Sequence, residues 1–470
     1  MNNRDGAYDT DRAIEICVSE LVQILKNLGS QNIYVKKLAP NDNSKNQPYF
    51  GSHLTDLSFL PTQELHASKS DSTKTKGDKR KVKFTAPLNF SWVDPEGRTY
   101  KAPNAKLIYY PQYPEVRFSG FLLSSKINFG DWMDPTKRGR FENRWLIFSV
   151  CDSEIFGYLA ISDSQLSREL SNTDLVKIDN VFSKIDFPYA STGTSNAKDI
   201  LLEKLLEIHQ IGWIPSQKFS ANGNISAYKA RNGGGYTLES KLGISPNGIA
   251  EPDYLGWEVK QFGVKQFPKV GAGVTTLMTP EPDGGIYREQ GAEYFVRNFG
   301  YADKNGKPNR MNFGGAHAAN TQNGSTGLKL SLIGFDSSTG KMTDATGVIA
   351  LLDSDNQVAA SWSFAKLMSH WKRKHSQAVY IPSLKRLNKA TGLVEYLYGS
   401  NIEMGIGTNF ELFLSAMNSC NIYYDPGIKL EKINEPKPVT KKRSQFRIRH
   451  NNLHNLYNNF DLIDIALKQH

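Results

Sequence analysis

A polar, turn-rich segment (DFPYASTGTSN) interrupts the apolar pattern of this chain at residues 186–196. Before it, short apolar runs alternate with Pro, Gly and Asp turns, which is typical of mainly β structure. After it, an amphipathic helix is expected at 197–209, and further helices mix with apolar strand candidates, which predicts an α/β core. Because 470 residues exceed what one hydrophobic core usually covers, we expect two domains, at 1–190 and 197–470.

The composition is that of a folded protein with a basic surplus. Hydrophobic residues make up 39% and aromatic residues 11% of the chain, which excludes wholesale disorder. A formal net charge of +10 favours a polyanionic partner, because Lys and Arg gain free energy by displacing counterions from phosphates. Residues 196–470 hold 32 Lys and Arg against 24 Asp and Glu, so the surplus lies mainly in the second part. We therefore expect a phosphate backbone to bind there.

The cysteines indicate a reducing compartment. Cys17, Cys151 and Cys420 are too few and too scattered for a disulfide framework or a paired-cysteine zinc site. The first residues lack the apolar segment of a signal peptide, and no run approaches the roughly 18 apolar residues of a membrane span. The sequence thus predicts a soluble, cytoplasmic protein with no membrane partner.

The stretch from Asp253 to Lys260 contains the pattern Asp-x4-Glu-x-Lys. If residues 257–262 form a strand, side chains alternate, so Glu258 and Lys260 share one face. Asp253 lies just upstream, where a bend can return its carboxylate toward Glu258. Two carboxylates, together with a backbone carbonyl such as that of Val259, offer the hard oxygen ligands that suit Mg²⁺.

This pattern matches the needs of phosphodiester hydrolysis. A metal ion lowers the pKa of a water molecule and neutralises charge in the transition state, and Lys260 would orient or activate that water. The pattern also occurs by chance, so it does not establish a nuclease by itself. Glu239 begins a second Glu-x-Lys on an expected helix, where residues i and i+2 do not share a face. Glu239 is either a supporting carboxylate near the metal or a solvated helix residue.

Over roughly residues 200–460 the chain resembles the MvaI/BcnI type II restriction endonucleases of the PD-(D/E)XK nuclease fold. The resemblance rests on landmarks in the family's order: IGW at 211–213, TLE at 237–239, PD at 252–253, EVK at 258–260, TLMTP at 276–280, WSF at 362–364, AVYI at 378–381 and FRI at 446–448. It implies that Asp253 and Glu258 bind the metal and that Lys260 completes the active site.

The same resemblance implies how DNA is read. Arg447 would recognise a guanine in the major groove through its two-pronged donor geometry, with Asp425 on the same reading surface. The alternative for Arg447 is a solvated charge or an ion pair. Family members act as monomers on short G·C-rich pseudopalindromes such as CCWGG, so a monomer and a double-stranded DNA target of that kind are implied. The chain departs from the family in its length and in a Gly/Asn-rich, insertion-like stretch at 305–327.

The first part, over about residues 18–160, resembles the effector DNA-binding domain of EcoRII, which is a B3-like β-barrel. The resemblance rests on IYVKKLAPND at 33–42, IYY at 108–110 and EVR at 115–117. It implies a B3-like pseudobarrel in which six residues contact bases or phosphates: Lys36, Lys37, Asn41, Asp42, Glu115 and Arg117. The alternative is that these loop charges are merely solvated.

Together these observations predict a type II restriction endonuclease that makes Mg²⁺-dependent double-strand cuts at a short specific site. Its N-terminal domain would be an effector or specificity module that allows the monomer to bridge two DNA sites. Two alternatives stay open: a catalytically inactive, sequence-specific DNA-binding protein, and a modification-dependent or repair nuclease. His450 and His454 stand four residues apart, but no third ligand is evident, which favours surface side chains over a metal site.

Overall fold

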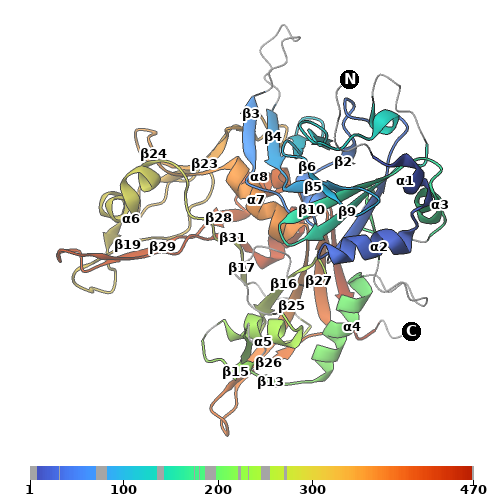
Figure 1. The fold of residues 1–470 in the computed structure, drawn as a ribbon. Helices are drawn as coiled ribbons and strands as arrows, with labels where there is room; N and C mark the ends of the chain where they lie inside the picture. The colour runs from blue at the N-terminus through green and yellow to red at the C-terminus, as the bar shows by residue number, and fades with distance from the viewer. Residues whose placement is uncertain are drawn as a thin grey trace. The chain divides into compact units, whose positions relative to one another are not determined.

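The computed structural model describes residues 8–467 apart from positions 31, 70–81, 135–141, 174, 179, 186–196, 221–223, 231, 245–253 and 269–272. The backbone contacts divide the chain into two compact units, Met1–Asn196 and Ala197–His470 (Figure 1). Within the described residues no helix is both long and apolar enough to cross a membrane. Each unit is built around its own sheets.

Two sheets form unit 1. In its described residues the larger sheet has the strand order β11 (Val176–Lys177), β12 (Ser183–Ile185), β1 (Asn32–Lys37), β9 (Trp145–Cys151), β10 (Glu154–Ala160), β5 (Phe90–Val93), β6 (Thr99–Lys101). The smaller sheet has the order β2 (Tyr49–Gly51), β8 (Glu115–Ser119), β7 (Lys106–Tyr110), β4 (Val82–Pro87), β3 (His66–Lys69). The helical segments are α1 (Thr10–Glu15), α2 (Val18–Asn27), α3 (Gln165–Asn172), η1 (Leu54–Leu57) and η2 (Gly130–Met133).

Aromatic side chains fill the space between these two sheets. The ring centroids of Phe50 on β2 and Phe148 on β9 are 5.4 Å apart, and those of Phe118 on β8 and Phe90 on β5 are 5.3 Å apart. Edge-to-face pairs of this kind add to the large apolar area that each ring buries. The described strands form two separate hydrogen-bonded sheets and no closed barrel, so the B3-like pseudobarrel implied by the resemblance is not shown. The B3-like identity of this unit stays a prediction.

The central sheet of unit 2 carries the segment with the Glu-x-Lys pattern. Its order is β13 (Ile214–Pro215), β26 (Val394–Tyr398), β25 (Gln377–Leu387), β27 (Asn401–Ile406), β32 (Asn459–Asp464), and β16 (Glu258–Gly263) pairs in parallel with the first part of β25. Helix α4 (Ala197–Gln210) packs Leu201, Leu205 and Ile208 into the same core as Val259 and Val379 (Figure 1). This mixed α/β arrangement is what the sequence predicted for the second domain.

A three-stranded antiparallel sheet, β17 (Val274–Met278), β31 (Phe446–Arg449) and β28 (Ile422–Tyr424), forms a second part of unit 2. We call it the reading sheet, after the base-reading role that the resemblance predicts for Arg447. The buried Trp362 packs against it at Tyr424 and Phe446, with ring centroids 4.5 and 5.2 Å away. The Trp362 indole donates to the Pro280 carbonyl at 3.0 Å, which fixes the ring.

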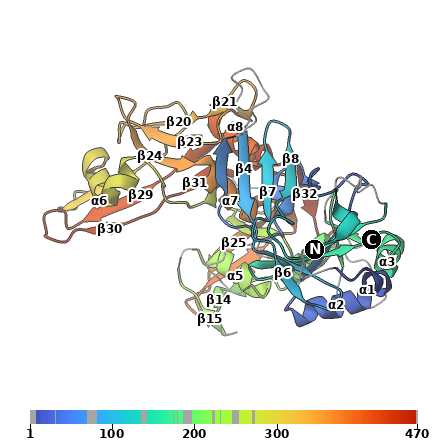
Figure 2. The same cartoon turned by 45° about the horizontal axis from the view of Figure 1, so that its top comes forward.

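Smaller elements complete unit 2 (Figure 2). The further strands are β14 (Gln217–Phe219), β15 (Ile225–Ala227), β18 (Tyr301–Ala302), β19 (Arg310–Gly314), β20 (Lys329–Ile333), β21 (Phe335–Asp336), β22 (Lys341–Met342), β23 (Val348–Leu352), β24 (Val358–Ser363), β29 (Gly427–Glu431) and β30 (Val439–Lys441). The further helical segments are α5 (Gly233–Lys241), α6 (Ile286–Phe299), α7 (Phe364–His375), α8 (Phe410–Asn418) and η3 (His450–Leu456).

Candidate active site and nucleic-acid interface

Strand β16 places Glu258 and Lys260 on one face, as the alternation of side chains predicted. The Lys260 Nζ donates to Glu258 Oε1 at 2.7 Å. Glu258 is only 3% exposed, and Val259 between them belongs to the hydrophobic core on the other face. A buried carboxylate is tolerated when an ammonium group and hydrogen bonds compensate the loss of water. The core thus fixes the strand, and the strand fixes the charged pair.

A tight reversal precedes β16. Tyr254 and Trp257 exchange backbone hydrogen bonds of 3.0 and 2.8 Å, and the two residues between them, Leu255 and Gly256, have φ values of 48° and 83°. Positive φ at both central positions is the geometry of a two-residue hairpin turn. The chain therefore turns back on itself just before Glu258. Asp253, which the sequence assigns to the metal, lies outside the described residues.

The donor atoms at β16 fit a hard divalent cation. Among the described residues no group of three or more His, Cys, Asp or Glu side chains is placed to hold a metal ion. Mg²⁺ does not need such a cage, because it keeps several waters and binds through one or two carboxylates. The Glu258 carboxylate and the Val259 carbonyl are oxygen donors of the required kind, and Asp253 would supply the second carboxylate. Binding by these three groups stays a prediction.

Two tyrosines lie beside the charged pair. Tyr380 on β25 is the cross-strand partner of Lys260, and its hydroxyl lies 2.8 Å from that of Tyr457. Burial, together with Tyr457 and the charge of Glu258, raises the pKa of Tyr380 well above its usual value. Burial likewise raises the pKa of Tyr457. Both phenols therefore stay neutral, and they contribute shape and hydrogen bonds without adding charge. Sequence analysis assigned no role to either: Tyr380 lies in the AVYI landmark, and Tyr457 carries no local signal.

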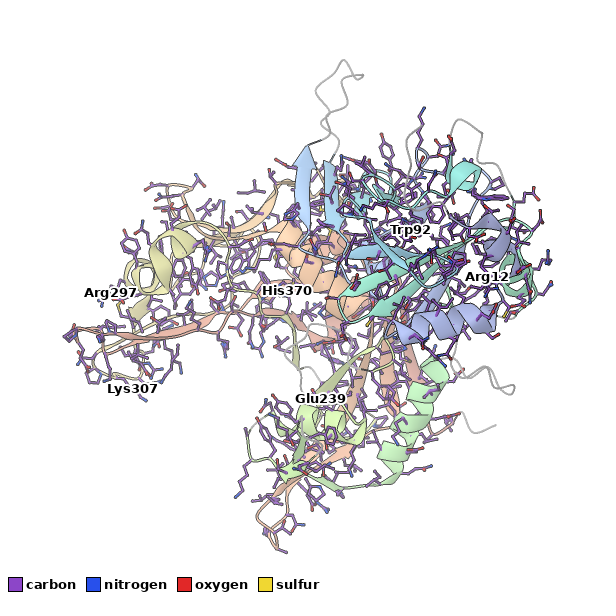
Figure 3. The ribbon with its side chains drawn as sticks, viewed as in Figure 1. Arg12, Trp92, Glu239, Arg297, Lys307 and His370 are labelled. Atoms are coloured by element: carbon purple, nitrogen blue, oxygen red, sulfur yellow. The ribbon has the colours of Figure 1, made fainter. Side chains whose placement is uncertain are left out.

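Glu239 lies on α5, which packs against β16 (Figure 3). The Gly-rich run that starts this helix has a packing role. A Cβ at Gly234 would lie 2.6 Å from Gln261 Oε1, so a larger residue there would have to displace the Gln261 side chain. Glu239 itself is partly buried and helps to raise the pKa of Tyr398, which burial raises most. Its role as a supporting carboxylate stays a prediction.

Arg447 occupies the middle strand of the reading sheet, opposite Thr276 on β17 and Tyr423 on β28. Its Nη1 donates to Asp425 Oδ2 at 2.5 Å, and its side chain is 29% exposed. The Nε group is buried and has no hydrogen-bond partner among the described residues. The structure thus contains the ion pair that was one interpretation of Arg447. A carboxylate that holds one edge of a guanidinium also fixes its plane, which a base-reading arginine needs.

In unit 1, Lys36 and Asp42 are buried, and Lys36 Nζ lies 3.6 Å from Asp42 Oδ2. Asp42 also accepts from the Ala39 amide at 2.9 Å. The fully buried Arg144 donates to the carbonyls of Ala39 and Asp42 at 3.1 and 2.8 Å. Burial lowers the pKa of Arg144 to about 10, so it stays charged at neutral pH. These groups hold the loop that follows β1, and DNA contacts by Lys36 and Asp42 stay predictions.

The other predicted contact residues of unit 1 are more accessible. Lys37 and Asn41 are exposed. Arg117 Nη2 donates to Glu115 Oε2 at 2.9 Å, and its Nη1 donates to the Gln47 carbonyl at 3.1 Å. Gln47 lies between β1 and β2, so this bond ties the loop after β1 to β8. The bond therefore connects Arg117, in one of the three segments on which the resemblance to the EcoRII domain rests, to the loop that follows another of them.

Three comparisons with known proteins bear on identity. A model of the MvaI/BcnI restriction endonuclease family matches residues 202–457. A solved complex of restriction endonuclease MvaI with cognate DNA substrate is 18% identical and covers 57% of this chain and 99% of that chain, with a TM-score of 0.42. MvaI in the absence of DNA is 16% identical and covers 58% and 100%, with a TM-score of 0.33. No curated protein matches.

The family match confirms the resemblance that the ordered landmarks of the second part indicated. It begins at residue 202, so it does not include unit 1, and the EcoRII-like assignment of that unit stays a prediction. The match spans more than half of the sequence. The chain therefore belongs to the MvaI/BcnI restriction endonuclease family.

Proposed function

We propose that this protein is a type II restriction endonuclease that makes Mg²⁺-dependent double-strand cuts at a short, specific DNA site. The observation that carries the proposal is the Glu258–Lys260 pair, held 2.7 Å apart on one face of β16 within a chain of the restriction endonuclease family. A buried carboxylate beside an ammonium group, at the start of an α/β sheet strand, suits both metal binding and stabilisation of a phosphoryl transition state.

Asp253, Glu258 and the Val259 carbonyl would hold the ion. When bound, Mg²⁺ supplies positive charge at the scissile phosphate and lowers the pKa of a water molecule. The chain's own side chains contribute by positioning the reacting groups. Lys260 lies on the same face as Glu258 and can hold the attacking water and share the negative charge that develops on the phosphate. Neutral Tyr380 and Tyr457 contribute a hydrogen bond beside that face without adding charge.

Recognition is assigned to the reading sheet. Arg447, fixed through Asp425, would donate two hydrogen bonds to a guanine, which is the most common specific contact in the major groove. The target would then be a short G·C-rich site of the CCWGG kind, bound by a monomer. Unit 1 would serve as an effector or specificity domain that binds DNA through the segments around Asn41 and Arg117.

The test uses the purified full-length chain with unmethylated phage DNA, in Mg²⁺ and in EDTA, followed by sequencing of the fragment ends. Discrete fragments that form only with Mg²⁺ and share one end sequence are expected. Tight DNA binding without cutting would contradict the proposal and support an inactive DNA-binding protein. Cutting confined to a methylated sample of the same DNA would instead support a modification-dependent nuclease.

A further inference from the structure

His450 is a buried histidine between the reading sheet and the central sheet. It follows β31 directly and is 2% exposed, so the surface position expected from the sequence is wrong. Its Nε2 donates to Glu403 Oε2 on β27 at 2.6 Å, because a carboxylate can only accept. Its Nδ1 lies 3.2 Å from the hydroxyl of Thr275 on β17, and its amide donates to the Gly273 carbonyl at 2.9 Å.

Through Glu403 the ring contacts the face that carries the candidate active site. Glu403 is the cross-strand partner of Tyr380, and Tyr380 is the partner of Lys260. Cross-strand partners project from the same face of a sheet. We call this the cutting face; it carries Glu258, Lys260, Tyr380 and Glu403. The ring of Phe262, two residues beyond Lys260, also packs on the imidazole, with centroids 3.8 Å apart.

His450 also contacts the reading sheet: its ring lies beside the Thr275 hydroxyl on β17, and the residue itself follows directly after β31. Thr275 pairs with Ile448, and its neighbour Thr276 pairs with Arg447. Arg447 lies three residues before His450 on the same strand. One side chain thus hydrogen-bonds to both the cutting face and the strand next to the arginine assigned to base reading.

We infer that His450 is a positioning residue that sets the place of Arg447 relative to Glu258 and Lys260. Its imidazole would fix the distance between the base being read and the phosphate being cut, so that only a correctly read site brings its phosphate onto the cutting face. Catalysis is sensitive to displacements of about 1 Å, and both ring nitrogens of His450 are used in a buried setting where lost hydrogen bonds are costly. This inference rests on the proposed endonuclease function.

The experiment compares two substitutions of His450, each of which can replace one of the two hydrogen-bonding nitrogens of the imidazole. In His450→Gln the amide nitrogen can reach the place of Nε2 and keep the bond to Glu403, whereas the shorter side chain of His450→Asn replaces only Nδ1. The exposed His454 on the same helical segment gives the control His454→Asn. Four quantities are measured: DNA affinity in EDTA, the single-turnover cleavage rate in Mg²⁺, the ratio of rates at the cognate site and at a site with one base changed, and the thermal midpoint.

His450→Asn is expected to lower the cleavage rate about 10-fold or more and to reduce the rate ratio, while affinity changes less than about 3-fold. His450→Gln is expected to recover most of the rate, and His454→Asn to match the wild type. Thr275→Val, which removes the hydroxyl at Nδ1, serves as a second variant if His450→Asn fails to fold. It is expected to reduce the rate ratio, and an unchanged ratio would overturn the inference.

A folded His450→Asn with the wild-type rate and ratio would overturn the inference while the proposed function stands. Equal losses in the Asn and Gln variants, in proportion to their lowered thermal midpoints, would assign His450 a structural role only and also overturn it. A wild-type chain that does not cut DNA would overturn the proposed function, and the inference with it.

Discussion

Glu258 and Lys260 depend on each other electrostatically, because both side chains are largely withdrawn from water and lie 2.7 Å apart. Removing the ammonium group takes away a compensating charge from a buried carboxylate and a donor from the reaction. Another Glu-x-Lys of the chain, Glu239 and Lys241, lies on α5, where residues i and i+2 do not share a face.

Lys260→Ala is therefore expected to lower the cleavage rate by about 100-fold or more, as loss of one transition-state donor does. Lys241→Ala is the matched control and should cut at the wild-type rate. Single-turnover cleavage of one fragment carrying the site compares the two variants. Equal rates for Lys260→Ala and Lys241→Ala would rule out the assigned role of Lys260.

Arg447→Lys keeps the charge but loses the planar fork that Asp425 fixes. The expected result is a loss of about 1–3 kcal/mol of discrimination against a changed G·C pair, with non-specific binding nearly unchanged. The control is Arg297→Lys on α6, an arginine paired with Glu293 (Figure 3). Competition binding between the site and single-base variants measures the difference, and unaltered discrimination in Arg447→Lys would contradict the reading role.

Among the elements, the insertion-like stretch 305–327 packs into unit 2 through a strand and backbone hydrogen bonds. It contributes β19 and a pair of backbone hydrogen bonds, 2.8 and 3.0 Å long, between His317 and Tyr424 of the reading sheet. The buried imidazole of His317 donates from Nδ1 to the Gly315 carbonyl at 2.9 Å and accepts from the Thr326 hydroxyl at 2.9 Å. The stretch thus supports the residue that precedes Asp425.

The contribution of His317 to folding stability should depend on pH. Burial lowers the pKa of His317 from 6.5 to about 4, so the unfolded chain takes up a proton first as the pH falls. The stabilisation is therefore fully present above about pH 6.5 and is lost, by roughly 3 kcal/mol, as the pH approaches 4. Thermal midpoints at about pH 7.5 and 4.5 test this: His317→Gln should show a smaller acid-induced fall than the wild type. His66→Gln, at an exposed site, should keep the wild-type fall.

Local sequence patterns predicted single strands and helices better than they predicted which strands pair with each other. The strand at 257–262 is observed as β16 at Glu258–Gly263, and alternation placed Glu258 and Lys260 correctly on one face. The amphipathic helix expected at 197–209 is observed as α4 at Ala197–Gln210. No local pattern revealed that β16 pairs in parallel with a strand 120 residues later, because that pairing depends on the packed core.

The same limit applies to the site. Tyr380, Glu403 and His450 come together only through long-range contacts, so local sequence assigned none of them a role beside Glu258 and Lys260, although Tyr380 lies in the AVYI landmark. Arg144 is similar, since a fully buried arginine reads in sequence as a surface charge. The proximity of Glu258 and Lys260 was predictable from their spacing, whereas the residues around them required the fold.

For the whole molecule, the family match covers most of unit 2 and does not include unit 1. The function of unit 1 therefore needs its own test. If unit 1 is an effector domain, its removal should change how cleavage depends on the number of sites. A fragment of residues 197–470 is expected to differ from the full chain in its rate on single-site DNA. Rates on matched one-site and two-site plasmids measure this, and identical rates for fragment and full chain would exclude the effector role.

The central claim is that a metal held at Glu258 allows this chain to cut DNA. Glu258→Gln tests it most directly, because the amide has nearly the same shape and its oxygen can still accept from Lys260. Single-turnover cleavage and DNA affinity are measured for the wild type and this variant, in Mg²⁺ and in EDTA. We predict cleavage by the wild type only with Mg²⁺, a loss of about 100-fold or more in the variant, and affinity within about 3-fold in EDTA. Cleavage by Glu258→Gln at the wild-type rate, or by the wild type in EDTA, would contradict the account.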